Sequence, residues 1–203
     1  MTISIYQDDI PADIDWGDAV AIDTEAMGLN NQRDRLCVVQ LSAGDGNAIL
    51  VQIAANPAPA PNLVALLADT GVVKLFHFGR FDMAILAHTY GTMPAPIYCT
   101  KIASKLARTY TDRHGLKELC REFLKVDLSK QQQSSDWGRT ELSKEQKAYA
   151  ASDVLYLHKL RDRLDSMLER EGRADLLTGC LEFLPIRVQL DLRGWDEMDI
   201  FSH

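Results

Sequence analysis

The feature that most constrains the fold is a set of three short apolar segments near the start of the chain. Residues 18–25, 36–42 and 48–53 are rich in β-branched residues and are separated by polar stretches. Segments of this length and composition favour strands over helices. The last two are joined only by residues 43–47, Ala-Gly-Asp-Gly-Asn, a linker of hairpin length. The pattern therefore predicts an antiparallel meander of three strands.

Downstream, strands and helices alternate before the chain becomes mostly helical. Residues 72–78 and 97–100 have the composition of further strands, and residues 126–142 are polar and typical of a loop. The spacing predicts helices over residues 62–69, 80–91, 101–110, 114–125, 143–170 and 173–183. Asn62 is the candidate N-cap of the first of these helices. We expect an α/β fold in a single domain over residues 1–203: a mixed β-sheet flanked by α-helices, with a helical C-terminal half.

The composition is that of an ordinary globular protein. The 203 residues are 46% hydrophobic and 25% charged, which excludes wholesale disorder. No segment approaches the ~18–20 apolar residues of a membrane helix, and the N-terminal segment does not read as a secretory signal. The four cysteines lie far apart, so neither a disulfide framework nor a zinc finger is indicated. We expect a cytoplasmic protein with reduced thiols and no membrane partner.

Acidic residues stand at the ends of several predicted elements. Asp23 and Glu25 lie two residues apart at the end of a strand, so their carboxylates share one face. Asp82 falls in the first turn of the helix that follows another strand, and Tyr149 and Asp153 lie four residues apart on one helix face. Each feature alone has an ordinary explanation: a solvated strand end, an acid favoured by the helix dipole, or a surface pair.

The four acids taken together favour a metal site. Hard divalent cations take oxygen ligands, and Mg²⁺ is commonly held by a few carboxylates together with substrate phosphate. Four converging carboxylates suit two cations roughly 3.5–4 Å apart, which stabilise the attacking and leaving oxygens of a phosphoryl displacement.

Three ordered blocks carry a family resemblance: Asp23-Thr24-Glu25, residues 77–82 (His-Phe-Gly-Arg-Phe-Asp) and residues 149–153 (Tyr-Ala-Ala-Ser-Asp). Weaker matches lie at 114–119 and from Lys130 to residue 137. In this order and spacing they resemble the DEDD superfamily of 3′→5′ exonucleases, most closely the ribonuclease D family. The tyrosine four residues before the last aspartate is similar to the tyrosine branch of that superfamily. The resemblance covers roughly residues 18–165.

The resemblance implies a ribonuclease H-like fold and two divalent cations, Mg²⁺ or Mn²⁺. The metal ligands would be Asp23, Glu25, Asp82 and Asp153, and Tyr149 would orient the attacking water. The implied activity is a 3′→5′ exoribonuclease that releases 5′-mononucleotides from single-stranded or structured RNA 3′ ends, in RNA processing or turnover. A preference for DNA ends stays open. A non-catalytic RNA-binding adaptor ranks lower, because all four acids and the tyrosine are present.

Substrate-binding residues are expected around these blocks and on a basic segment. Lys101, Lys105 and Arg108 share one helical face by their spacing, which makes them a candidate phosphate track. Together with residues taken from the resembling blocks, the predicted substrate-binding set is Thr24, Met27, His77, Phe78, Lys101, Lys105, Arg108 and Lys130.

Three departures from the family pattern bear on substrate preference. Phe78 stands where many relatives carry Asn, and Cys99 stands where they usually carry Asp. Residues 139–142, Arg-Thr-Glu-Leu, replace a more usual Arg-Pro-Leu pattern. None of the three removes a proposed metal ligand.

The net charge of −7 argues against a protein that coats nucleic acid by bulk charge. Residues 101–130 nevertheless carry eight basic and four acidic residues, a local excess of positive charge. The balance is compatible with an enzyme that grips a chain end through metal ions and few phosphate contacts. The sequence makes no prediction about protein partners.

Overall fold

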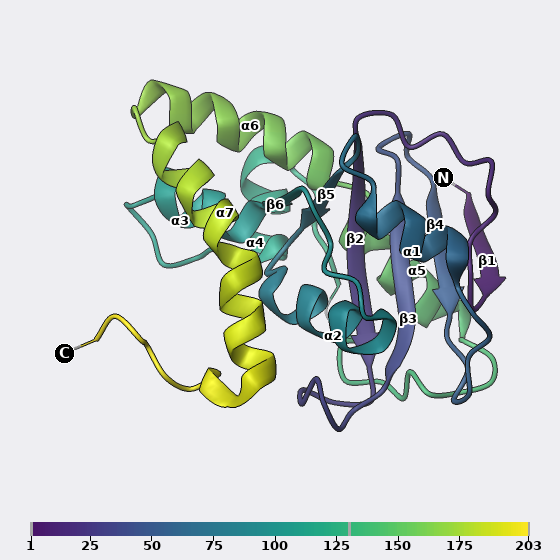
Figure 1. Cartoon of the computed structure of the whole chain (residues 1–203). Coiled ribbons are helices and arrows are strands. Elements are labelled where there is room, and N and C mark those ends of the chain that lie inside the picture. The colour runs from purple at the N-terminus through teal and green to yellow at the C-terminus, as the bar shows by residue number, and fades with distance from the viewer. Residues whose placement is uncertain (1, 130, 203) are drawn as a thin grey trace.

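A computed structural model describes residues 2–129 and 131–202. Its centre is a six-stranded mixed sheet with the strand order β1-β4-β3-β2-β5-β6 (Figure 1). The strands are β1 (Ile3–Gln7), β2 (Ala19–Ala26), β3 (Leu36–Ser42), β4 (Ala48–Gln52), β5 (Val73–Phe76) and β6 (Ile97–Cys99). The predicted mixed α/β sheet is thereby confirmed.

The meander predicted from the three apolar segments forms the middle of the sheet. β2 pairs antiparallel with β3, and β3 pairs antiparallel with β4. β5 then pairs in parallel with β2, and β6 pairs in parallel with β5, each after a helical connection. The edge strand β1, which pairs in parallel with β4, was not predicted. Its sequence, Ile-Ser-Ile-Tyr-Gln, lacks the continuous apolar run of the other strands, and its residues are half-buried or exposed at the edge of the sheet.

The helices lie where they are predicted, but their ends differ and one predicted helix is divided in two. They are α1 (Pro61–Ala68), α2 (Arg80–Tyr90), α3 (Thr100–Ala107), α4 (Leu116–Leu119), α5 (Lys144–Val154), α6 (Leu157–Arg170) and α7 (Ala174–Leu190), with π-helical turns η1 (Cys120–Leu124) and η2 (Asp191–Trp195). The predicted N-cap Asn62 is wrong, because α1 starts at Pro61 and Ala60 occupies the cap position. The predicted helix 143–170 is interrupted between α5 and α6, and the last helix runs seven residues beyond the predicted end, to Leu190.

Helices cover both faces of the sheet (Figure 1). The face formed by Val20 and Ile22 packs against α1, α2 and the end of α7. The opposite face, with Ala19 and Ala21 of β2, packs against α5 and α6. Within the described residues, no helix has the length and apolar character needed to cross a membrane.

Ion pairs join the C-terminal turn η2 to α2. The Arg80 guanidinium at the start of α2 donates to the Asp191 carboxylate at 2.6 and 2.8 Å. Arg187, one turn earlier on α7, also donates to Asp191 at 2.7 Å. This pairing joins η2 to α2, the helix that carries Asp82.

Candidate active site

Asp23 and Glu25 lie on β2, the strand at the centre of the sheet. Asp23 pairs with Gln40 and Glu25 with Val38 in the antiparallel register with β3. Because side chains alternate along a strand, both carboxylates project on the face that α5 covers. The register shifts between Glu25 and Ala26, so the regular ladder ends just beyond the second acid. The predicted shared face of the two carboxylates is confirmed.

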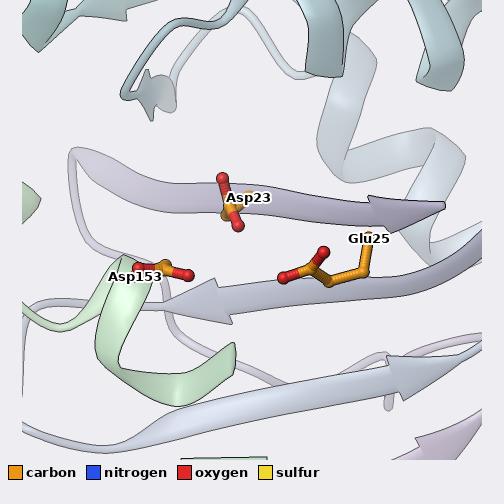
Figure 2. Close-up of side chains that lie close together, drawn as sticks. All are labelled: Asp23, Glu25 and Asp153. Atoms are coloured by element: carbon orange, nitrogen blue, oxygen red, sulfur yellow. The ribbon is translucent and has the colours of Figure 1, made fainter. Parts of the chain in front are cut away.

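Asp153 approaches these two acids from α5. Each of the three side chains offers an oxygen, and these oxygens lie within 4.8 Å of one another. Figure 2 shows the three carboxylates turned toward a common space. The neighbouring helix residues Ala150 and Ala151 are fully buried and small, which lets the helix lie close to the sheet. Two segments more than a hundred residues apart thus meet at one cluster.

The start of α5 is held by a capping box. The Ser143 hydroxyl accepts from the Gln146 backbone N–H, and the Gln146 side chain accepts in return from the Ser143 N–H. The Gln146 amide also donates to the Asp136 carbonyl and the Ser135 hydroxyl. These bonds join the helix to the loop before it and orient the face that carries Tyr149 and Asp153.

Asp82, the fourth acid, lies in the first turn of α2 and lines the same cavity. It is buried, and its Oδ1 accepts a 2.6 Å hydrogen bond from the Thr24 hydroxyl. Thr24 lies between Asp23 and Glu25 on β2, and its side chain links the strand to α2. The turn into the helix is tight: a side chain at Gly79 would place its Cβ 2.6 Å from the Cβ of Phe76.

Burial and mutual repulsion make the ionised forms of these acids unfavourable. Burial raises the pKa of Asp23 well above its usual range, and the neighbouring acids raise it further. The pKa of Glu25 is raised to about 9 by burial and by the charges of Asp153 and Asp82. Burial raises the pKa of Asp82 to about 7. The ionised carboxylates repel one another, and the positive charge of bound divalent cations would offset this repulsion. Carboxylate oxygens are also the ligands that such hard cations prefer.

Tyr149 lies one turn before Asp153 on α5 and lines the cavity beside the acids. Its ring packs against that of Trp137, with centroids 6.0 Å apart and planes inclined by 38°. Burial, followed by the charges of Asp153, Glu25 and Asp23, raises the pKa of the phenol. Tyr149 therefore keeps its proton at neutral pH and acts as a hydrogen-bond donor.

The acids line one wall of an open cavity of about 670 Å³. Thr24, Met27, His77, Phe78 and Lys101, all predicted to contact substrate, line it as well. Met27 and Phe78 are half exposed. The Lys101 ammonium lies 4.0 Å from the centre of the Phe78 ring. Phe78 has a φ of +72°, a strained conformation for a bulky residue that turns its side chain outward after β5.

His77 is held by the start of α3. Its Nδ1 lies 2.9 Å from the Thr100 hydroxyl oxygen, and that hydroxyl donates to the Phe76 carbonyl. The Thr100 hydroxyl at the start of α3 therefore orients the imidazole. His77 and Lys101 reach the cavity from two different elements.

The predicted phosphate track on α3 is wrong at Arg108. This side chain is 1% exposed, because α3 ends at Ala107 and Arg108 turns inward. Its guanidinium donates to the Arg113 carbonyl at 2.6 Å and to the Ser104 hydroxyl at 3.2 Å, and it forms an ion pair with Glu122. Lys105 is exposed on α3 and stays a prediction. Lys130 lies outside the described residues.

Sequence reasoning missed cavity residues contributed by two segments. Leu116 and Lys117 reach the cavity from the start of α4, and Gln133 and Ser134 reach it from the loop before α5. Both segments carried weaker family similarity, which was the available signal. Trp137 also lines the cavity, but at 3% exposure it packs in the core rather than presenting a free face.

Comparisons with known proteins agree with this geometry. Residues 8–169 match the family described as 3′-5′ exonuclease. The ribonuclease D of Gluconacetobacter diazotrophicus is 36% identical over 165 residues, which cover 81% of this chain and 42% of that protein. The chain thus spans less than half the length of this curated relative.

Solved structures extend the similarity over the whole chain. NrnC of Brucella melitensis bound to pGG is 60% identical with a TM-score of 0.97, covering 100% of this chain and 99% of that one. The same protein with bound Mg²⁺ is 59% identical with a TM-score of 0.96, covering 100% of both chains.

The RNase D of Escherichia coli, titled an exoribonuclease involved in structured RNA processing, is 26% identical with a TM-score of 0.76 over 85% of this chain and 45% of that one. The predicted ribonuclease H-like α/β fold is thereby confirmed. With a family match over residues 8–169 and a full-length structural relative at 60% identity, this chain belongs to the 3′-5′ exonuclease family.

Proposed function

We propose that this chain is a metal-dependent 3′→5′ exoribonuclease, built as one domain, that releases 5′-mononucleotides from RNA 3′ ends. The observation that carries the proposal is the convergence of Asp23, Glu25 and Asp153 within 4.8 Å, with Asp82 and Tyr149 on the same cavity. The Mg²⁺-bound structure of the 59% identical NrnC supports the divalent cation.

Asp23, Glu25, Asp82 and Asp153 would hold two divalent cations, Mg²⁺ or Mn²⁺. When bound, the cations would activate the attacking water and stabilise the leaving 3′ oxygen. The Thr24 hydroxyl donates to Oδ1 of Asp82 at 2.6 Å and would keep this carboxylate oriented toward the cavity. The rigid strand β2 and the capped helix α5 keep the carboxylates in place, so little reorganisation is needed during the reaction.

Tyr149 would orient the attacking water. The phenol keeps its proton, since burial and the neighbouring carboxylates raise its pKa, and it therefore donates a hydrogen bond rather than removing a proton. Packing against the Trp137 ring would help to hold the phenol beside the acids. Tyr149 would therefore hold the water in place without acting as its general base.

The substrate would be the 3′ end of RNA. Met27 and Phe78 offer apolar surface to bases, while Lys101 offers charge to a phosphate and His77 a hydrogen bond. The relatives named ribonuclease D favour RNA over DNA. The binding of pGG by NrnC supports substrates as short as two nucleotides.

The decisive experiment compares RNA and DNA oligonucleotides of two to twenty nucleotides, labelled at either end, with Mg²⁺, Mn²⁺ or EDTA. We expect mononucleotide release from the RNA 3′ end, which EDTA and Asp23→Asn abolish. The matched control is Glu141→Gln, an exposed acid outside the cavity lining, which keeps the activity.

Other outcomes lead to different conclusions. Faster cleavage of DNA than of RNA would reassign the substrate. Tight RNA binding without cleavage in any metal would favour the adaptor instead. Activity that survives both EDTA and Asp23→Asn would refute the metal mechanism.

A further inference from the structure

Gln40 is a buried polar side chain that the site described so far does not use. It lies in the middle of β3 with 0% of its surface exposed. Among the described residues, neither its Oε1 nor its Nε2 has a hydrogen-bond partner. A buried amide left without partners costs about 1–3 kcal/mol for each group, so its presence in the core calls for an explanation.

The register of the sheet places Gln40 directly opposite Asp23. Opposite residues of antiparallel strands project on the same face, with Cβ atoms about 4.5–5.5 Å apart. On its other side Gln40 pairs with Leu50 of β4. The helix covering this face contributes Ala150, which packs among Val38 and Leu50 and offers no polar side chain.

Two other polar side chains that the sheet presents on this face, Ser42 and Gln52, are already engaged. The Ser42 hydroxyl donates to the Asn47 carbonyl at 2.6 Å. The Gln52 amide donates to the Arg139 carbonyl at 2.6 Å and to the Thr140 carbonyl at 3.1 Å. Of the two residues that pair with Gln40 across the sheet, Asp23 and Leu50, only Asp23 has a side chain that can accept from the Gln40 amide.

We propose that Gln40 is a positioning residue for Asp23: with a cation bound and the Asp23 carboxylate ionised, the side-chain amide of Gln40 donates to that carboxylate and orients it toward the cation. Hydrogen bonds to metal-ligating carboxylates typically strengthen cation binding, and losing them costs about 10–100-fold in affinity. This inference rests on the proposed function, because it requires Asp23 to be a metal ligand.

The test measures Mn²⁺ affinity by calorimetry, and thermal unfolding without cation, for the wild type, Gln40→Met, Gln40→Leu and Gln52→Met. Met closely matches the length of Gln and removes only the amide. We expect both Gln40 variants to lose about tenfold in Mn²⁺ affinity. Their cation-free unfolding temperatures should not fall, because the amide they lose is unpaired. Gln52→Met, on the same face but next to Val38, should bind Mn²⁺ as the wild type does.

Two results would overturn the inference. One is wild-type Mn²⁺ affinity in both Gln40 variants. The other is a lower cation-free unfolding temperature in both, which would assign Gln40 a merely structural role. Asp23→Asn separates this failure from that of the proposed function. If Asp23→Asn also binds Mn²⁺ normally, the metal site itself has been misassigned; if only the Gln40 variants do, the positioning role alone fails.

Discussion

Replacing Glu25 with Gln should stabilise the cation-free protein while weakening its response to cations. The pKa of Glu25 is raised from 4.5 to about 9, so at pH 7 this group is protonated in the folded chain and ionised in the unfolded chain. Each pH unit between 4.5 and 7 then adds about 1.4 kcal/mol of destabilisation, which amounts to about 3 kcal/mol at pH 7. Gln stays neutral in both states and removes this cost.

The expected gain is about 2 kcal/mol, because water at the open rim of the cavity screens part of the interaction. For a chain of this size that corresponds to an increase of about 4–8 °C in the unfolding temperature. The assay is thermal unfolding in EDTA from pH 4.5 to pH 8. Wild-type stability should fall relative to Glu25→Gln as the pH rises through this range, since the folded state binds the extra proton. The two curves should converge near pH 4.5.

Addition of Mn²⁺ should reverse the order. The wild type gains stability from the bound cation, whereas Glu25→Gln has lost a ligand and gains less. Glu141→Gln, an exposed substitution outside the cavity lining, should stay within about 0.5 kcal/mol of the wild type. A Glu25→Gln protein that is no more stable than the wild type at pH 7 in EDTA, or whose advantage does not shrink toward pH 4.5, would refute this reasoning.

Further predictions concern the neighbours of the acids. Thr24→Val removes the hydroxyl that donates to Asp82 and should raise the pKa of this acid further. The rising limb of the pH–rate profile should therefore move to higher pH, and Thr24→Ser, which keeps a hydroxyl, should leave the profile as in the wild type. Tyr149→Phe should keep Mn²⁺ affinity by calorimetry and lose about 10²-fold in turnover, and unchanged turnover would remove its assigned role. Lys101→Ala should weaken RNA binding and reduce the salt slope by about 1 without changing the unfolding temperature. Arg108→Ala should instead destabilise the fold by about 1–3 kcal/mol in urea titrations, because it removes a buried side chain that donates to the Ser104 hydroxyl and the Arg113 carbonyl. A stable variant with weakened RNA binding would restore the phosphate-track prediction.

The local part of the site could be predicted from the chain because it depends on short spacings. Side chains two positions apart in a strand lie on the same face, and so do side chains four positions apart in a helix. Asp23 with Glu25, and Tyr149 with Asp153, therefore follow from periodicity once the elements are assigned. Runs of apolar residues identified those elements, and among the described strands only β1, which has no such run, was not predicted.

Other features could not be predicted because they depend on contacts between distant segments. Arg108 shares a helical period with Lys101 and Lys105, but the helix ends one residue before it. Its side chain then turns into the interior and donates to the Arg113 carbonyl. The positive φ of Phe78 likewise follows from the tight passage between β5 and α2.

The sequence by itself determined which chemistry the chain can carry: four carboxylates and a tyrosine placed at the ends and on the faces of regular elements. Only the tertiary structure decided that they meet. The register of β2 with β3 and the packing of α5 on the sheet bring Asp153 to Asp23 and Glu25, and the same register sets Gln40 opposite Asp23. Strand register and helix packing depend on contacts between residues that are distant in the sequence, so the local spacing of side chains does not determine them.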